Sequence, residues 1–184
     1  RAIAPVLSHM AEDIWQNLPY AKDCESVFQA GWVKLEADWE NPSLAEQWQQ
    51  LRALRQDVNR VLEKARAEKA IGASLEAKVR LYVPDAELRD LLMAMNPGDH
   101  AATGRNHVDE LRYLFLVSQV EVLDSADPLQ GLTYRSESDA WGIGVTDAEG
   151  EKCDRCWNYS THIGESADHP TICDRCVGAL AGTF

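Results

Sequence analysis

The sequence contains no apolar run that approaches the roughly 20 residues needed by a membrane-spanning helix. Its first residues also lack the basic flank and the apolar segment that together form a secretory signal. These two absences argue against a helical membrane protein and against a secreted one. We therefore expect a cytoplasmic protein with no membrane partner.

Cysteine is scarce as well, with 5 residues in 184. Four of them form two Cys-x-x-Cys pairs near the end of the sequence, which fits an intracellular metal site better than a disulfide framework. The fifth, Cys24, has no local histidine that would activate it as a nucleophile. We expect Cys24 to be a small buried or loop side chain.

Basic side chains are fewer than acidic ones, and the formal net charge is −12. Lysine and arginine dominate phosphate binding, so the total argues against a nucleic-acid partner. The distribution argues the other way: residues 51–80 hold 8 basic and 4 acidic side chains, whereas residues 1–50 hold 3 and 8 and residues 81–184 hold 7 and 18. One basic segment is therefore embedded in an acidic chain.

The first part of the sequence has the apolar spacing of amphipathic helices. One helix is predicted from Leu7 to Leu18, and a longer one after Asn41-Pro42-Ser43, ending at Gly72. The predicted inner face of the longer helix comprises Leu44, Trp48, Leu51, Val58, Leu62 and Ala65. The chain begins without methionine, so we expect a piece of a longer polypeptide whose upstream helices complete the packing of an otherwise exposed apolar surface.

The middle of the sequence predicts a small α+β module. Its expected elements are a strand at 77–83, a helix from Pro84-Asp85 to Met95 stopped by Asn96-Pro97-Gly98, a helix at 108–117, a strand at 120–123 and strands at 132–136 and 141–146. The predicted fold class is α+β overall. The predicted domains are 1–73 (helical), 74–148 (the α+β module) and 149–184 (a four-cysteine peptide).

The cysteine motif is Cys153-Asp154-Arg155-Cys156, followed after 16 residues by Cys173-Asp174-Arg175-Cys176. Two such turns can direct four thiolates at one zinc ion, and four sulfur ligands leave no open position for water. We therefore predict one structural zinc. Two redox motifs are the alternative, but neither pair lies between a strand and a helix of a βαβ unit. His162 and His169 lie between the pairs and could each replace one cysteine.

Three segments resemble the isoleucyl-tRNA synthetases of bacterial type. Residues 54–77 are similar to the late anticodon-binding region of that family, and residues 7–15 to the helix before it, although Met10 stands where the family often has threonine. Residues 150–157 and 172–177 look like the family's C-terminal zinc-binding peptide. The related leucyl and valyl enzymes, as families, do not end in this four-cysteine peptide. The resemblance places the N-terminal helices in an anticodon-binding helical bundle.

The resemblance implies a class I ligase that joins isoleucine to its tRNA with ATP and Mg²⁺ and hydrolyses mischarged valine. Editing is needed because one methylene is worth only about 1–3 kcal/mol in an apolar pocket. Both the synthetic and the editing centre would lie upstream of Arg1. This fragment alone is therefore predicted to hold no catalytic residue and to be inactive. We also expect a monomer. His162-Ile163-Gly164-Glu165 resembles the ATP-binding signature of the class, but it lies in the zinc loop and ends in glutamate.

If the partner is an isoleucine-accepting tRNA, the basic segment supplies the contacts. The RNA-binding candidates are Arg52, Arg55, Asn59, Arg60, Arg66, Lys69 and Trp157. A solvated helix face with internal ion pairs, such as Lys64 to Glu68, is the alternative for the cations. Trp157 could stack on an unpaired base or cover the cysteine cluster.

Two other functions fit parts of the sequence. A zinc-ribbon DNA-binding module of the DNA glycosylase type shares the cysteine pairs, but residues 150–184 hold only 3 basic against 5 acidic side chains. A non-catalytic protein-interaction scaffold would use the acidic surface for docking.

Overall fold

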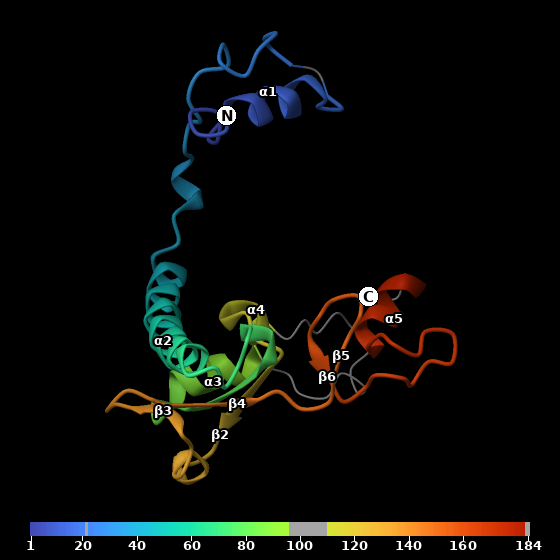
Figure 1. Ribbon diagram of the computed structural model, residues 1–184. Coiled ribbons are helices and arrows are strands. Elements are labelled where there is room, and N and C mark those ends of the chain that lie inside the picture. The colour runs from blue at the N-terminus through green and yellow to red at the C-terminus, as the bar shows by residue number, and fades with distance from the viewer. Residues whose placement is uncertain (21, 96–109, 183–184) are drawn as a thin grey trace. The chain divides into compact units, whose positions relative to one another are not determined.

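The computed structural model describes residues 1–20, 22–95 and 110–182 (Figure 1). The chain divides into two compact units, Arg1–Gln47 and Trp48–Phe184, and each is described by itself. Within the described ranges, no helix is long and apolar enough to cross a membrane. The predicted tripartite division at residues 73 and 148 stays a prediction.

The first unit is a helix with a loop folded against it. Helix α1 spans Ser8–Gln16, which confirms the predicted helix but is shorter than the predicted range from Leu7 to Leu18, and a 3-10 turn, η1, spans Ala37–Trp39. The small core consists of Ala4, Ala11, Trp15 and Val27. The Trp15 indole donates to the carbonyl of Cys24 at 3.2 Å, which ties the loop to the helix. Cys24 is half-buried in this loop.

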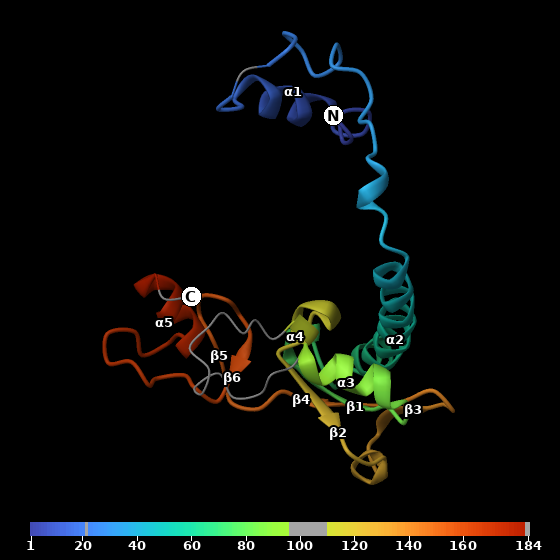
Figure 2. The same ribbon diagram turned by 180° about the vertical axis from the view of Figure 1, so that it is seen from behind.

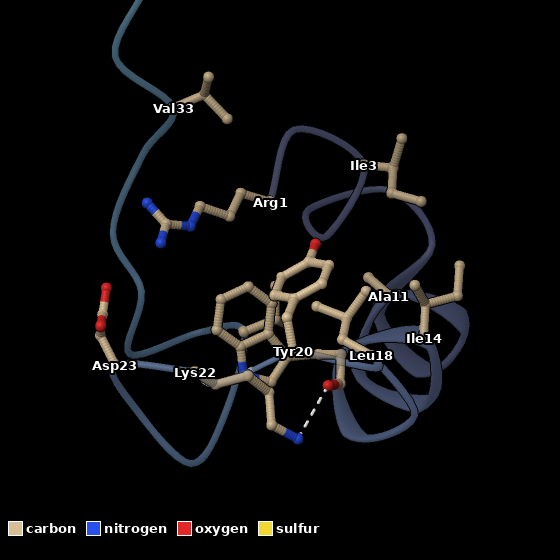
Figure 3. A pocket seen from close by; sticks show the side chains of 11 residues that line it. Arg1, Ile3, Ala11, Ile14, Leu18, Tyr20, Lys22, Asp23 and Val33 are labelled. Atoms are coloured by element: carbon tan, nitrogen blue, oxygen red, sulfur yellow. Dashed lines mark hydrogen bonds between the residues drawn. The ribbon is translucent and has the colours of Figure 1, made fainter.

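Much apolar surface in this unit remains exposed, as the sequence predicted. The exposed large hydrophobic side chains are Ile3, Val6, Leu7, Met10, Ile14, Tyr20, Phe28, Trp32, Val33, Leu35, Trp39 and Leu44. Figure 3 shows a hollow lined by Leu18 and Tyr20 beside α1, where the Lys22 ammonium donates to the Trp15 carbonyl at 3.0 Å. A core this small leaves one face of α1 without a covering layer within the described part of the unit.

Helix α2 spans Pro42–Ala67 and starts where predicted, because the Asn41 carboxamide oxygen accepts from the backbone N–H of Leu44 at 3.0 Å. Its buried face runs from Leu51 onward. The predicted inner face was wrong for Leu44 and Trp48, which are 48% and 43% exposed, because the core against which α2 packs begins at Leu51.

The predicted end of this helix was also wrong. α2 stops at Ala67 rather than at Gly72, because Lys69 takes the left-handed conformation with φ 59°. A left-handed residue just past the last turn terminates a helix, and it is usually glycine. Here lysine occupies that position.

The second unit contains a four-stranded sheet in the order β2-β1-β4-β3. Its strands are β1 (Ala77–Tyr82), β2 (Gln119–Leu123), β3 (Tyr134–Glu137) and β4 (Gly142–Asp147). β1 and β2 are parallel, and the connection between them includes α3 (Ala86–Ala94) and α4 (Glu110–Phe115). β4 pairs antiparallel with both β1 and β3. The predicted α+β class and all four predicted strands are confirmed.

Helix α3 begins as predicted, because the Asp85 carboxylate accepts from the N–H of Leu88 at 2.8 Å. It ends at Ala94, and the predicted stop at 96–98 lies outside the described residues, as do the first two residues of the predicted helix at 108–117.

One face of the sheet is covered by helices, and the other is covered only in part. Alternate residues of β1, namely Ala77, Val79 and Leu81, are fully buried in a core shared with α2, α3 and α4. On β4, glycine makes room for a side chain from the short helix η4 (Asp127–Leu129). A Cβ atom at Gly142 or Gly144 would lie 2.6 or 2.8 Å from the buried Leu129 side chain.

The last part of the unit is the cysteine module, residues 149–182. It contains a two-stranded hairpin of β5 (Glu151–Lys152) and β6 (Tyr159–Ser160), followed by helix α5 (Asp174–Ala181) (Figures 1 and 2). A turn of 3-10 helix, η2 (Ser74–Glu76), precedes β1. The sheet and the hairpin together position the cysteines.

Candidate metal centre

Each Cys-x-x-Cys pair forms a tight turn closed by a backbone hydrogen bond. The N–H of Trp157 donates to the Cys153 carbonyl at 2.9 Å, and the N–H of Val177 donates to the Cys173 carbonyl at 3.0 Å. The first turn requires a left-handed residue, and Trp157 supplies it with φ 66°. The second turn is the start of α5. Both turns direct their two sulfur atoms to the same side.

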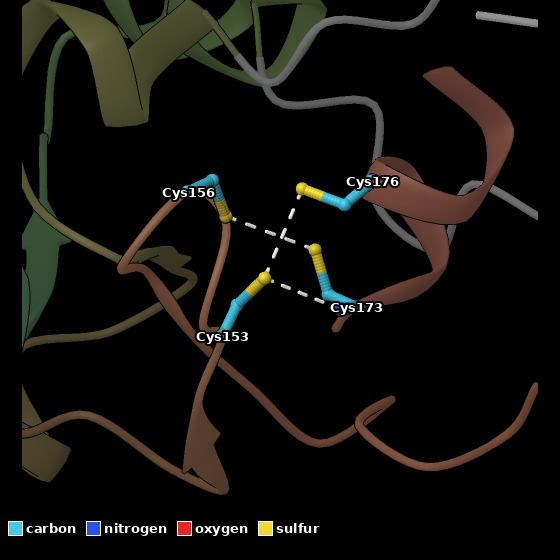
Figure 4. A group of neighbouring side chains, drawn as sticks. All are labelled: Cys153, Cys156, Cys173 and Cys176. Carbon is cyan, nitrogen blue, oxygen red and sulfur yellow. Dashed lines mark hydrogen bonds between the residues drawn. The ribbon is translucent and has the colours of Figure 1, made fainter. Parts of the chain in front are cut away.

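The structure brings the four predicted cysteine side chains together. Their Sγ atoms all lie within 4.8 Å of one another, and the Cys153–Cys176 and Cys156–Cys173 distances are both 3.8 Å (Figure 4). A tetrahedral site with zinc–sulfur bonds of about 2.3 Å has edges of about 3.8 Å. The sulfur spacing therefore fits a zinc ion.

The electrostatics of the cluster also fit a divalent cation. Burial disfavours a charged Cys156 thiolate, but hydrogen bonds from Asn158 and Arg175 outweigh it and lower the pKa of Cys156 to about 6. Burial and the neighbouring Cys156 charge raise the pKa of Cys173 to about 12. Four thiolates this close cannot all ionise alone, and a metal ion is the charge that permits it.

A serine that the sequence did not single out attaches this module to the sheet. Ser118 is fully buried immediately before β2, and its Oγ donates to the Leu75 carbonyl at 2.5 Å while accepting from the N–H of Tyr159 at 2.8 Å. The Gln119 carboxamide makes two further bonds, to the N–H and the carbonyl of Glu149. A lone serine between a helix and a strand carries no signal in a single sequence, so these contacts required the structure.

We predict that Ser118→Ala lowers the free energy of unfolding by about 1–3 kcal/mol, because it leaves the N–H of the half-buried Tyr159 and the carbonyl of the half-buried Leu75 without their partner. Denaturant unfolding of the zinc-loaded chain measures the loss. Ser125→Ala, which removes an exposed hydroxyl, is the matched control and should change stability by less than about 0.5 kcal/mol. Equal stability of the two variants would contradict the assigned role of Ser118.

The two histidines of the intervening loop lie outside the sulfur cluster. His162 pairs through Nδ1 with Glu165 at 2.6 Å, and His169 is exposed. Among the described residues, the only group of metal-ligating side chains close enough to hold an ion is the four cysteines. The sequence Ile163-Gly164 lies in the same surface loop, after β6.

The RNA-binding candidates fall on two elements. Arg52, Arg55, Asn59 and Arg60 are exposed along α2, and Lys69 follows its end. Arg60 forms an ion pair with Asp57, and the half-buried Arg66 pairs with Glu63 at 2.5 Å and donates to Ser74 Oγ at 2.7 Å. Arg60 and Arg66 are therefore paired within the helix, as the alternative of a solvated helix face with internal ion pairs predicts.

Trp157 lies on the cysteine module. Its side chain is 61% exposed, and the Lys152 ammonium lies 5.3 Å from the ring centroid. The hydrophobic residues packed around the buried sulfurs are Ile163 and Ile172 rather than this indole. The ring is thus available to solvent on one side of the module.

Two family models match the chain. Residues 1–81 match a model described as the anticodon-binding domain of tRNA ligase, and residues 150–178 match one described as a zinc finger found in FPG and IleRS. With the sulfur cluster, the second match suggests a bound zinc ion. The description of the zinc finger covers two groups of proteins, so the match to residues 1–81 is needed to separate them.

Curated proteins similar to this chain are isoleucine–tRNA ligases of cyanobacteria. The ligase of Nostoc sp. (strain PCC 7120) is 66% identical over 184 residues, which is 100% of this chain and 19% of the relative. That of Synechococcus sp. (strain ATCC 27144) is 60% identical over 183 residues, again 100% of this chain and 19% of the relative. The chain spans about one fifth of the length of these relatives. Along its whole length the chain corresponds to the C-terminal anticodon-binding and zinc-finger region of isoleucine–tRNA ligases.

Proposed function

We propose that this chain is the tRNA-binding part of a cytoplasmic, monomeric enzyme. That enzyme ligates isoleucine to its tRNA with ATP and Mg²⁺, and it hydrolyses tRNA that has been mischarged with valine. The observation that carries the proposal is the match of the whole chain, at 66% identity, to an isoleucine–tRNA ligase. Activation and editing would take place in domains outside these 184 residues, and the fragment alone would be inactive. Its own contribution would be to bind the anticodon arm of an isoleucine-accepting tRNA.

The four cysteines would hold one structural zinc ion. Cys153, Cys156, Cys173 and Cys176 are all sulfur donors, which zinc accepts in a closed tetrahedral shell without room for a reacting water. The spacing of 3.8 Å between sulfurs supports this assignment. When bound, the ion supplies structural free energy rather than hydrolytic chemistry.

The exposed arginines of α2 would contact the RNA backbone. Arg52 and Arg55 are exposed and lie one turn apart, so both guanidinium groups can face neighbouring phosphates. The positive charge of Arg60 is partly compensated by the Asp57 carboxylate, and the positive charge of Arg66 by the Glu63 carboxylate. Trp157, exposed beside Lys152, would stack on an unpaired base.

The experiment is a salt series of tRNA binding by variants of the zinc-loaded chain. Replacing both Arg52 and Arg55 by Gln should reduce the slope of log affinity against log salt by about 2, which is about 1 for each lost phosphate contact. Arg60→Gln is the control, because its charge is already paired, and it should change the slope by much less. An unchanged slope in the double variant would remove these arginines from the interface.

A further inference from the structure

The cysteine module is attached to the rest of its unit at two places. At the hairpin end, Ser118 and Gln119 hydrogen-bond residues of the module that lie before β5 and in β6. At the other end, the Arg175 guanidinium of α5 donates to the Tyr113 hydroxyl of α4 at 2.7 Å, and its central carbon lies 5.8 Å from the Tyr113 ring centroid. A body held at one place can pivot about it, and a second attachment prevents that motion. The contact between α4 and α5 therefore fixes the orientation of the module.

The two Cys-Asp-Arg-Cys turns use their arginines differently, although the arginine has the same place in both. Arg155 of the first turn is exposed and donates to the Cys176 sulfur at 3.6 Å, inside the module. Arg175 of the second turn is half-buried and donates out of the module, to Tyr113. Both a hydrogen bond from a charged donor and a cation–π contact act on this one tyrosine. Arg175 is thus the arginine that joins the module to α4.

Trp157 moves with the module, because the first cysteine turn carries it. Its backbone N–H donates to the Cys153 carbonyl at 2.9 Å. The first turn is joined to α5 through the cluster: the Cys153 and Cys176 sulfurs lie 3.8 Å apart, and the N–H of Asp154 donates to the Thr171 carbonyl at 3.1 Å. A ring that stacks on a base contributes most when it is ordered before the RNA binds, because ordering it on binding costs free energy.

We propose that Arg175 and Tyr113 are positioning residues for tRNA binding: their contact stops the cysteine module from pivoting about Ser118 and so holds Trp157 ready for an unpaired base. This inference rests on the proposed function, in which Trp157 stacks on the RNA. Arg175 and Tyr113 act through Trp157 and bind each other rather than the tRNA. The role belongs to Arg175 and not to the equivalent Arg155.

The test is a double-mutant cycle of Tyr113→Phe and Trp157→Ala, in which the affinity of each zinc-loaded variant for an isoleucine-accepting tRNA is measured. Tyr113→Phe removes only the hydroxyl and should weaken binding about threefold, since the module must then be ordered on binding. Trp157→Ala should weaken binding about tenfold, because it removes one stacked base. The double variant should bind as Trp157→Ala does, because two residues that act through one contact are not additive.

Tyr82→Phe is the matched control, because it makes the same chemical change on β1, away from the contact between α4 and α5. It should bind tRNA with the unaltered affinity. Tyr113→Phe removes no charge, so it should leave the slope of log affinity against log salt unchanged. Arg175→Gln, introduced into the Tyr113→Phe chain, should weaken binding no further. A further loss would show that Arg175 acts on the tRNA by another route and would overturn its pairing with Tyr113.

The other outcomes separate the two proposals. An unaltered chain without tRNA affinity, or a Trp157→Ala chain with unaltered affinity, would overturn the proposed RNA contact of the module and this inference with it. Losses that multiply, to about thirtyfold in the double variant, would overturn the positioning role alone, since Tyr113 would then act independently of Trp157. Unaltered affinity in Tyr113→Phe, or an equal loss in Tyr82→Phe, would also overturn it.

Discussion

Removing zinc with a chelator is expected to unfold the cysteine module while the four-stranded sheet stays folded. The packed centre of the module consists of the four cysteines with Ile163 and Ile172, which is too small a core to offset the conformational entropy of about 30 ordered residues. Structural zinc contributes about 10–16 kcal/mol in isolated zinc-finger peptides, more than such a module has from any other source. The sheet has its own core of fully buried residues, including Val79, Leu81 and Ile143.

Hydrogen exchange measured with and without chelator reports this change residue by residue. Amides of residues 151–181 should lose their protection, and those of β1 should keep it. Cys173→Ser should reproduce the loss without chelator, whereas Cys24→Ser, at a cysteine outside the cluster, should bind one zinc and keep full protection. Persistent protection of the module after zinc removal would contradict a structural role for the ion.

Gly150→Ala should lower the free energy of unfolding of the cysteine module by about 3 kcal/mol or more. Gly150 has φ 84°, and a Cβ atom there would lie 2.2 Å from the Ser160 carbonyl oxygen and 2.6 Å from the Thr161 nitrogen. A left-handed non-glycine residue costs about 1–3 kcal/mol, and the overlap with backbone atoms adds a comparable cost because β5 and β6 must separate. The module should therefore open without any change at a cysteine.

Gly131→Ala provides the matched control. Gly131 has a similar φ of 88°, but a Cβ atom there meets nothing within 4 Å. Only the backbone conformation is penalised, so the loss should be about 1 kcal/mol. Denaturant unfolding and zinc titration of both variants measure the difference. Equal losses of stability would show that the overlap of a Cβ atom at position 150 with the backbone at the end of β6 costs no free energy.

Local patterns in the sequence predicted most of the second unit. The alternation from Ala77 and the Asp85 cap determine β1 and the start of α3 through interactions within a few residues, and the structure confirms both. The spacing of the cysteine pairs similarly predicted that four sulfurs meet. The strand, the helix cap and each Cys-x-x-Cys turn are fixed by interactions within a few residues, and the meeting of the two turns was inferred from the chemistry of four thiolates.

Long-range packing was less predictable. Periodicity placed Leu44 and Trp48 on the inner face of α2, but whether such a residue is buried depends on where the opposing core begins. Lysine at the helix end replaced the expected glycine, because a left-handed conformation is allowed to other residues at a moderate cost. The Ser118 contacts join residues 41 and 43 positions apart, separations that no local pattern records.

Binding of the zinc-loaded chain to an isoleucine-accepting tRNA and to an unrelated tRNA, at matched salt concentrations, tests most directly whether this region recognises tRNA. We expect tighter binding of the isoleucine-accepting tRNA, with an affinity that falls as salt rises. Equal affinity for the two tRNAs, or tighter binding of duplex DNA than of either, would contradict the proposed recognition of the anticodon arm.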